Sequence, residues 1–452
     1  MISLYDTATQ EVVPLQLRDP GKVSIYVCGP TVYAPPHIGH GRQLLVYDVL
    51  RRYLEWSGFE VTFVSNVTDI DDNIIKRAAE EGRDWNDIVT RCEAVWWTAV
   101  DRLGVGRPDE VPHATDYVDQ MVGLIETLIA SDAAYVTSDG AYLSVKDIDG
   151  YGLLAHQSLD SLQEGGGERD LVGAEKRHPA DFVLWKLGKE GEPSWPSPWG
   201  DGRPGWHTEC VVMSLDLLGE GFDLHTGGLD LTFPHHENER AQAIAWGRPF
   251  ANHWMHHGFV ELEGEKMSKS LGNVRNLLDL TEVYDPRAYR LLILRSHYRS
   301  PIEVTDATMV DAEAAMERLD TFARRTATLA GGVLDEGALD GFRRVMDNDL
   351  DTAGGVDLLF RQVREGNTAL DAGDEASAMR AAATVRQIAG ALGLVLDEAT
   401  SAVPEEIQVL VDERQSARQA KDFARADTIR DELGAAGWTV EDSAAGPVAR
   451  PM

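Results

Sequence analysis

Two short apolar runs near the start of the chain flank an amphipathic stretch. Residues 23–27 (VSIYV) form a run typical of a buried strand, which ends at Cys28. From Leu44 apolar residues recur on one helical face and charged residues on the other, so the pattern predicts an amphipathic helix that ends near Gly58. Residues 59–65 alternate between apolar and polar positions, as a strand does. Strand, helix and strand in this order predict a βαβ unit within a parallel sheet.

This pattern is interrupted and then resumes. Residues 115–204 are interpreted as an insertion, because they run into a loop rich in Pro, Gly and Trp (EPSWPSPWGDGRPGW). The later pattern predicts, in order, a short helix that opens at Cys210, a strand at residues 222–225, a helix from about Pro234 to Trp246, and a strand around residues 253–258. The insertion is therefore expected to split the sheet.

The last third of the chain is predicted to be helical. Residues 310–395 are rich in Ala, Leu and Arg with few strand signals, and Pro404 opens a last unit that is helical to about Leu433 and short and irregular beyond it. The predicted fold class is α/β: a split Rossmann-type parallel sheet with an insertion, an all-α helical bundle, and a small C-terminal domain. The expected boundaries are 1–114 and 205–309 for the two halves of the sheet domain, 115–204 for the insertion, 310–400 for the bundle and 401–452 for the last unit.

Composition and charge narrow the class of protein. Of the 452 residues, 43% are hydrophobic and 26% charged, which is ordinary for a globular chain. No apolar run approaches the roughly 18 residues of a membrane span, and the first residues lack a signal-peptide pattern, so we expect a soluble cytoplasmic protein with no membrane partner. The net charge of -33 excludes a general affinity for nucleic acid, so a polyanion would have to bind local basic patches. Three cysteines make a disulfide framework improbable.

The first candidate site is the tetrapeptide His37, Ile38, Gly39 and His40, which follows the first strand at a predicted helix start. Helix N-termini in open α/β sheets bind phosphate through free N–H groups, and two imidazoles there could donate to a phosphate in a transition state. The alternative is a surface turn that happens to contain two histidines.

The second candidate site is the run Lys266, Met267, Ser268, Lys269 and Ser270, with glycines on both sides. Two lysines on a glycine-flanked loop suit the neutralisation of a leaving pyrophosphate. Taken alone, a pair of lysines three apart could equally be a solvated loop.

The two motifs together carry a resemblance. HIGH followed by KMSKS is the double signature of class I aminoacyl-tRNA synthetases, and the stretches NVTDIDD, PGWHTEC, FPHHENE and WMHHGFV resemble the cysteinyl-tRNA synthetase family. The segments VMDNDLDT and KDFARADTIRDEL resemble the helical and anticodon-side regions of that family. The resemblance runs from about Ser24 to Asp442 and implies the family's fold, its activity in protein biosynthesis and its substrates.

A third candidate site follows from residue chemistry. His235 and Glu239 lie four apart on a predicted helix and therefore share one face, while Cys28 ends a strand and Cys210 opens a helix. Two thiolates, an imidazole and a carboxylate would suit one zinc ion per chain. The alternative is that both cysteines are small buried apolar residues beside a polar helix start. The resemblance favours zinc, because the family's ligands fall on these four positions.

The resemblance also implies the residues that hold the amino acid. Thr68 and Trp206 match pocket residues, and Asp230 is a candidate partner for the substrate ammonium, although Trp206 could equally be core. His225 could contact ATP or the amino acid, or it could equally be a buried core histidine. Three further histidines could either support the ligand residues from outside or be merely polar: His236, His256 and His257.

A basic stripe in the last unit is a candidate tRNA contact. Arg414, Arg418, Lys421 and Arg425 fall at i, i+4, i+7 and i+11, which predicts one helical face. The alternative is a solvated face paired with the acidic residues Asp422 and Glu413.

These observations predict a cysteine–tRNA ligase. We expect it to activate L-cysteine with ATP and Mg²⁺, with His37, His40, Lys266 and Lys269 as catalytic residues, and to transfer the cysteinyl group to tRNA(Cys) as a monomer. Zinc would select the thiol, because an apolar pocket rejects serine by only about 1–3 kcal/mol. Two alternatives remain: a small-molecule cysteine ligase of mycothiol biosynthesis, which lacks an anticodon-side unit, and a non-catalytic paralogue that binds tRNA or zinc.

Overall fold

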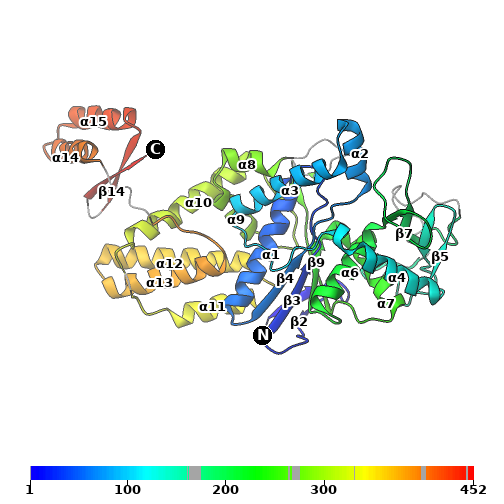
Figure 1. Ribbon diagram of the computed structural model, residues 1–452. Coiled ribbons are helices and arrows are strands. Elements are labelled where there is room, and N and C mark those ends of the chain that lie inside the picture. Colours follow the sequence, from blue (N-terminus) through cyan, green and yellow to red (C-terminus); the bar gives the residue numbers. More distant parts are fainter. Residues whose placement is uncertain are drawn as a thin grey trace. The chain divides into compact units, whose positions relative to one another are not determined.

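A four-stranded parallel sheet lies within the larger of two compact units of the chain (Figure 1). The computed structural model describes residues 2–159, 161, 175–262, 265–266, 275–329, 331–398, 404–443 and 446–451. The sheet has the order β10–β9–β3–β4, with bounds His253–His257, Leu224–Gly228, Lys22–Val27 and Glu60–Ser65. Because β3 from before the insertion pairs with β9 from after it, with Tyr26 opposite His225, the predicted split of the sheet is confirmed.

Helices cover both sides of this sheet, with α1 on one side and α6 on the other (Figure 1). The helices that follow the strands are α1 (Ile38–Trp56), α2 (Asp72–Glu81), α3 (Trp85–Arg102), α6 (Trp206–Leu218) and α7 (Glu237–Trp246). The expectation that Cys210 opens a helix was wrong. Helix α6 begins at Trp206, directly after the extended residue Gly205, and so Cys210 lies in its second turn.

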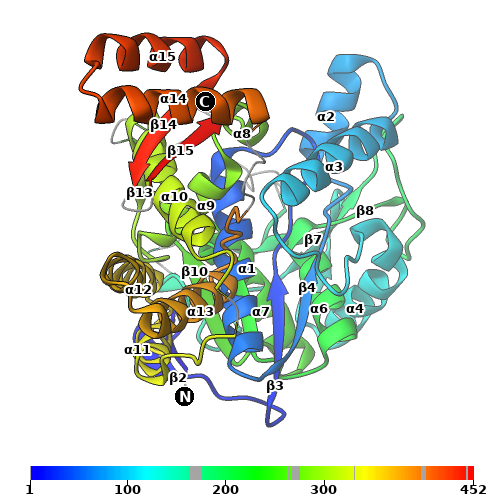
Figure 2. The same cartoon turned by 90° about the vertical axis from the view of Figure 1, so that its left-hand side faces the viewer.

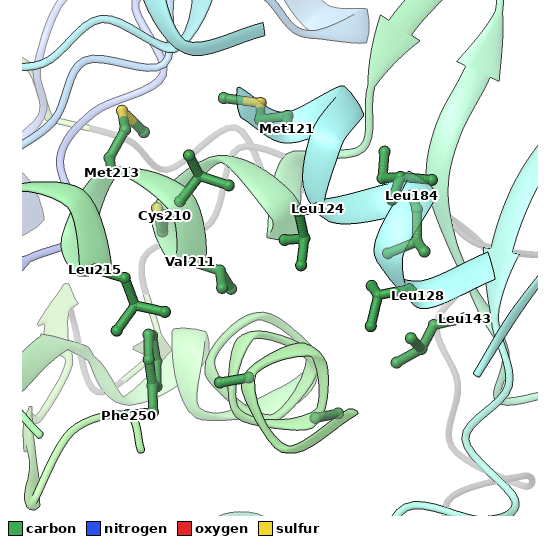
Figure 3. Packing of buried hydrophobic residues seen from close by; sticks show 14 of the residues in the cluster. Met121, Leu124, Leu128, Leu143, Leu184, Cys210, Val211, Met213, Leu215 and Phe250 are labelled. Carbon is green, nitrogen blue, oxygen red and sulfur yellow. The ribbon is translucent and has the colours of Figure 1, made fainter. Parts of the chain in front are cut away.

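The insertion packs on the second half of the sheet domain. It contains a 3₁₀ turn (Ala114–Tyr117), helix α4 (Val118–Ala130) and an antiparallel sheet of β5 (Ala134–Val136), β6 (Gly140–Leu143), β7 (Phe182–Leu187) and β8 (Gly202–Pro204). Figure 3 shows Met121 and Leu124 of α4 in one cluster with Val211 and Leu215 of α6. Since Cys210 belongs to the same cluster, the insertion shares a core with the helix that carries this cysteine.

Short elements and further helices complete the chain up to residue 391. The strands are β1 (Ser3–Asp6), β2 (Glu11–Pro14), β11 (Val260–Leu262), β12 (Glu265–Lys266) and β13 (Ile302–Glu303). The helices are α8 (Leu277–Val283), α9 (Pro286–Leu294), α10 (Asp306–Arg325), α11 (Glu336–Met346), α12 (Thr352–Ala372) and α13 (Glu375–Ala391).

The chain divides into two compact units, residues 1–317, 336–360 and 386–395 in the first and residues 318–335, 361–385 and 396–452 in the second. Among the described residues no helix is long and apolar enough to span a bilayer.

The end of the chain is a small helix and hairpin unit. Helices α14 (Glu405–Gln419) and α15 (Phe423–Ala435) lie side by side against the antiparallel hairpin of β14 (Trp438–Ser443) and β15 (Gly446–Pro451) (Figure 2). Ile407, Val411, Ile429 and Leu433 form its core. The expectation of an irregular tail was wrong, because Trp438 and Val440 alternate with polar residues and pack on that core.

A buried ion pair ties α1 to α9. The carboxylate of Asp48 accepts from Arg290 at 2.5 Å, and both side chains are 2% exposed. Burial alone would raise the pKa of Asp48, but Arg290 and Arg52 outweigh it and lower this pKa. The stabilisation from this carboxylate is therefore present above the ordinary pKa of an aspartate, about 3.9, and is lost as the pH falls through the lower pKa of the folded chain.

We expect Asp48→Asn to lower the free energy of unfolding by about 3–5 kcal/mol, because it leaves the Arg290 charge buried and unpaired. Urea unfolding followed by tryptophan fluorescence measures this loss. Glu55→Gln is the matched control, since Glu55 pairs with Arg51 at the surface and should change stability by at most about 0.5 kcal/mol. Equal effects of the two substitutions would contradict the prediction.

Candidate active site

Four buried side chains with metal-ligand chemistry meet at the end of β3. Cys28 follows β3, Cys210 lies on α6, and Glu239 lies in the first turn of α7. His235 lies in the π turn Thr232–His236 that precedes α7, so it is not on the α-helix itself as expected, yet its Nε2 lies 2.8 Å from Oε1 of Glu239. The four ligand atoms all lie within 4.8 Å of one another, and each side chain is at most 3% exposed.

The spacing of this cluster agrees with tetrahedral coordination. The two Sγ atoms of Cys28 and Cys210 lie 3.7 Å apart, which is too long for a disulfide. Two sulfur atoms held at about 2.3 Å by one tetrahedral zinc ion would lie about 3.8 Å apart. Cys28 Sγ lies 3.6 Å from Oε1 of Glu239, and Cys210 Sγ lies 3.7 Å from Nε2 of His235. The donor set and its distances therefore fit a metal ion.

Further histidines surround the cluster. His225 Nε2 lies 2.6 Å from Oε2 of Glu239, and His207 Nδ1 lies 2.8 Å from Nδ1 of His235. His236 bonds His256 at 2.8 Å, and His225 and His236 form a second group of possible ligands with Cys28 and Glu239. The sequence analysis did not single out His207, although it lies in the stretch PGWHTEC three residues before Cys210. Its role depends on a contact with a residue 28 positions away, which no local pattern predicts.

The HIGH segment forms the first turn of α1. His37 caps the helix: its Nδ1 accepts from the N–H of His40 at 3.4 Å, and Nδ1 of His40 accepts from the N–H of His37 at 3.2 Å. The two rings stack with centroids 3.7 Å apart. Because both Nδ1 atoms act as acceptors, the ring hydrogen of each neutral imidazole lies on Nε2.

One cavity joins the cluster to this helix start. It has a volume of about 430 Å³, and its lining includes Cys28, His37, His40, Trp206 and Asp230. It lies at the carboxyl end of β3, next to β9, where the order of the strands reverses. Ligands of open α/β sheets bind at such a point. A molecule in this cavity can therefore contact the cluster and the N-terminus of α1 together.

The comparisons with known proteins agree with this geometry. Residues 14–314 match the family described as tRNA synthetases class I (C) catalytic domain, residues 341–397 the DALR domain, and residues 400–446 the cysteinyl-tRNA ligase anticodon binding domain. The sequence is 45% identical over 456 residues to the cysteine–tRNA ligase of Halorhodospira halophila, covering 99% of this chain and 98% of that protein. The chain belongs to the cysteine–tRNA ligase family.

A second relative supports the assignment to this family, and a solved structure supports the fold. The cysteine–tRNA ligase of Chromobacterium violaceum is 43% identical over 464 residues, covering 100% of both chains. A structure of methionyl-tRNA synthetase from Mycobacterium tuberculosis, in complex with methionyl-adenylate, aligns with a TM-score of 0.63 at 16% identity, over 82% of this chain and 89% of that one. The predicted fold class is thereby confirmed.

The residues predicted to hold the amino acid differ in their surroundings. Trp206 lines the cavity and stacks on His235, with ring centroids 3.9 Å apart. Asp230 also lines the cavity. Thr68 is only 1% exposed, and its hydroxyl donates to Glu209 at 2.9 Å. Burial, together with the neighbouring Cys210, raises the pKa of Glu209.

Most of the KMSKS segment lies outside the described residues. Lys266 belongs to β12, whereas Met267, Ser268, Lys269 and Ser270 are not described. The chain just beyond them bonds the HIGH segment: the N–H of Ile38 donates to the carbonyl of Arg275, and the N–H of Leu277 donates to that of Pro36. The segment that follows the KMSKS run is therefore joined to the start of α1 through backbone hydrogen bonds.

The basic stripe does not form one helical face, and this part of the prediction was wrong. Helix α14 ends at Gln419, and Lys421 has a φ of 62°, a left-handed conformation that breaks the helix. Asp422 then caps α15 by accepting from the N–H of Arg425. The residues of the stripe thus divide between α14, which carries Arg414 and Arg418, the turn with Lys421, and α15, which carries Arg425. Arg425 pairs with Glu413 at 3.1 Å and with Glu432 at 3.2 Å, so one of the pairs named in the alternative interpretation is present.

The electrostatics of the cluster favour a charged ligand set. Burial opposes the charge of Glu239, yet His225 and His235 lower its pKa well below the usual range. Burial likewise opposes the charge of His235, but the Glu239 carboxylate raises its pKa to about 10. Burial favours the neutral thiol of Cys210, but hydrogen bonds from Cys28 and His235 lower its pKa to about 6. These contacts favour the thiolate at Cys210, whereas burial and the neighbouring Cys210 and Glu239 raise the pKa of the Cys28 thiol.

Proposed function

We propose that this chain activates L-cysteine with ATP, forming cysteinyl adenylate and pyrophosphate, and then transfers the cysteinyl group to the 2′-hydroxyl of the terminal adenosine of tRNA(Cys). The observation that carries the proposal is the single cavity lined by Cys28 together with His37 and His40. A thiol at the cluster and a phosphate at the start of α1 would lie in the same space, as a reaction between the two substrates requires. The chain would work as a monomer in the cytoplasm.

We propose zinc as the metal of the cluster, held by Cys28, Cys210, His235 and Glu239. A mixed set of soft thiolates, an imidazole and a carboxylate suits this ion. When bound, zinc would supply a thiophilic centre that distinguishes a thiol from a hydroxyl. His207 supports the set by bonding Nδ1 of His235, which orients Nε2 toward Cys210 and Glu239.

The proposed catalytic role of His37 and His40 is donation to the α-phosphate. Their reciprocal caps use both Nδ1 atoms as acceptors, so donation to a phosphate would come from the Nε2–H groups. The positive end of the α1 dipole adds to the attraction for phosphate, and Ile38 and Gly39 complete the first turn that would receive the nucleotide. Such donors stabilise charge that develops only in the transition state.

The remaining parts follow the family resemblance. Lys266 and Lys269 would neutralise the leaving pyrophosphate together with Mg²⁺, with Met267, Ser268 and Ser270 completing the loop around ATP. Asp230 would hold the substrate ammonium. Trp206 would form a wall of the amino-acid pocket. Thr68, whose hydroxyl donates to Glu209, would support this pocket.

Two assays on the full chain test this function. We expect cysteine-dependent exchange of pyrophosphate into ATP, and incorporation of radiolabelled cysteine into purified tRNA(Cys). Exchange without tRNA charging, but with transfer of cysteine to an amino sugar, would favour the small-molecule ligase instead. A chain that binds tRNA or zinc but shows neither reaction would be a non-catalytic paralogue.

We propose that the last unit, residues 401–452, binds tRNA through the basic residues Arg414, Arg418, Lys421 and Arg425. Arg414→Glu combined with Arg418→Glu should raise the KM for tRNA roughly tenfold and flatten its salt dependence, because two phosphate contacts would be lost. Cysteine-dependent pyrophosphate exchange should not change. Arg430→Glu is the matched control, because Arg430 is an exposed arginine of α15 outside this set that pairs with Asp427. An equal effect of the control would mean that only overall charge matters.

A further inference from the structure

A buried arginine lies directly after the HIGH segment and binds backbone carbonyls from distant parts of the chain. Arg42 lies in α1 and is 1% exposed. Its Nη1 donates to the carbonyl of Phe259 at 2.7 Å. Its Nη2 donates to the carbonyls of Tyr298 at 2.8 Å and Ser300 at 2.5 Å, with His297 at 3.4 Å. Burial lowers the pKa of Arg42 to about 10, so the guanidinium remains charged near neutral pH.

One of the two segments that Arg42 joins, the one with Phe259, forms a wall of the cavity. Gly258, Phe259 and Val260 all line it. Val260 opens β11, which pairs with β13, and Glu261 of β11 pairs with Lys266 of β12. Because Phe259 directly precedes Val260, its position affects where the hairpin of β11 and β12 begins.

The turn at residues 297–300, whose carbonyls bind Arg42 (the carbonyl turn), packs tightly against Gly258 in the cavity wall. The N–H of Gly258 donates to the carbonyl of Tyr298 at 2.8 Å. A side chain at Gly258 would place its Cβ 2.5 Å from the carbonyl oxygen of Arg299 and 2.9 Å from that of Ser300. Converging carbonyl oxygens repel one another, and the Arg42 guanidinium is the cation that holds them together.

We propose that Arg42 is a positioning residue for cysteine activation, whose guanidinium fixes β11, and with it Lys266, relative to the first turn of α1. The inference rests on the proposed function. It differs from a purely structural role because the Phe259 segment that Arg42 holds lines the cavity, where a displacement of about 1 Å can reduce a rate by about 100-fold.

A second buried arginine provides the matched control. Arg290 is 2% exposed, and it binds the Asp48 carboxylate and the carbonyls of Leu103 and Gly104. It does not line the cavity. A lysine keeps the charge at either position but cannot reproduce the planar fork of donors, so both substitutions lose comparable hydrogen bonds.

The test compares Arg42→Lys with Arg290→Lys by pyrophosphate exchange in the full, zinc-loaded chain. We expect Arg42→Lys to lower kcat/KM for ATP by about 10- to 100-fold, with the KM for cysteine and the zinc content unchanged. Arg290→Lys should lower the thermal midpoint but leave kcat/KM for ATP within about twofold. Equal losses for ATP in the two variants, or no loss in Arg42→Lys, would overturn the inference.

Two further measurements cover the cases in which Arg42→Lys does not fold or the unmodified chain shows no exchange. Should Arg42→Lys fail to fold, Gly258→Ala displaces the same carbonyl turn and must show the same selective loss for ATP; an unchanged kcat/KM for ATP would overturn the inference. Absence of exchange in the unmodified chain would instead contradict the proposed function, so the two failures are distinguishable.

Discussion

Replacement of Cys210 by serine is expected to release zinc and to abolish the preference for cysteine over serine. A serine hydroxyl stays protonated at neutral pH and is a poor ligand for a soft metal, whereas the pKa of Cys210 is already lowered to about 6. Loss of a residue that only supports a ligand reduces metal affinity by about 10- to 100-fold, so loss of a ligand should exceed 100-fold. The zinc content measured by elemental analysis and the KM for cysteine should therefore change together.

The third cysteine of the chain provides the control for this experiment. Cys92 is also buried, at 3% exposed, but it packs with apolar residues such as Val32 and Ile88 away from the cluster. Cys92→Ser should retain zinc and full discrimination, even if it lowers stability. An active unmodified chain that contains no zinc would refute the proposed metal, and serine-dependent exchange at the cysteine rate would refute its role in selection.

Replacement of His40 by glutamine is expected to keep the capping box of α1 while it removes the imidazole that is proposed to act in catalysis. His40 occupies the N3 position, where glutamine can also reach back to the N–H of the capping residue His37. The free energy of unfolding should therefore change by no more than about 0.5 kcal/mol. The rate of cysteine-dependent pyrophosphate exchange should fall by about 100- to 1,000-fold, because the imidazole donor to the phosphate is lost.

The alanine variant completes this comparison. His40→Ala removes both the return hydrogen bond of the capping box and the imidazole donor, so it should match the kinetic loss of His40→Gln and lose about 1 kcal/mol of stability in addition. Pyrophosphate exchange at the full rate in His40→Gln would mean that His40 serves only as a cap. Thermal unfolding and exchange measured on the same preparations distinguish these outcomes.

The parts that could be predicted from the sequence are those set by local patterns and side-chain chemistry. The run at residues 23–27 predicted a strand, and β3 spans Lys22–Val27, because a continuous apolar run before a turn is a local signal. The helix start expected at the HIGH segment is also present, with His37 as the cap and Ile38 as the first residue of α1. Side-chain chemistry allowed Cys28 and Cys210 to be grouped, although they are 182 positions apart, because the chain has only three cysteines and thiolates are preferred zinc ligands.

Where a local signal was weak or overlooked, the prediction was wrong. The spacing from Arg414 to Arg425 suggested one helix, but the left-handed Lys421 and the cap at Asp422 divide it into two. The hairpin at the end of the chain had a signal in the alternation of Trp438 and Val440, which is typical of a strand.

By itself the sequence determined the alternation of strands and helices in the sheet domain and its interruption by an insertion, because hydrophobic periodicity is local, and side-chain chemistry indicated the residue types of the cluster. Only the tertiary structure decided that His207 supports His235, that one cavity joins Cys28 to the start of α1, and that Arg42 binds the carbonyl of Ser300, 258 positions away. Those arrangements depend on packing between segments distant in sequence, and a backbone carbonyl that accepts a hydrogen bond leaves no trace in the identity of its residue.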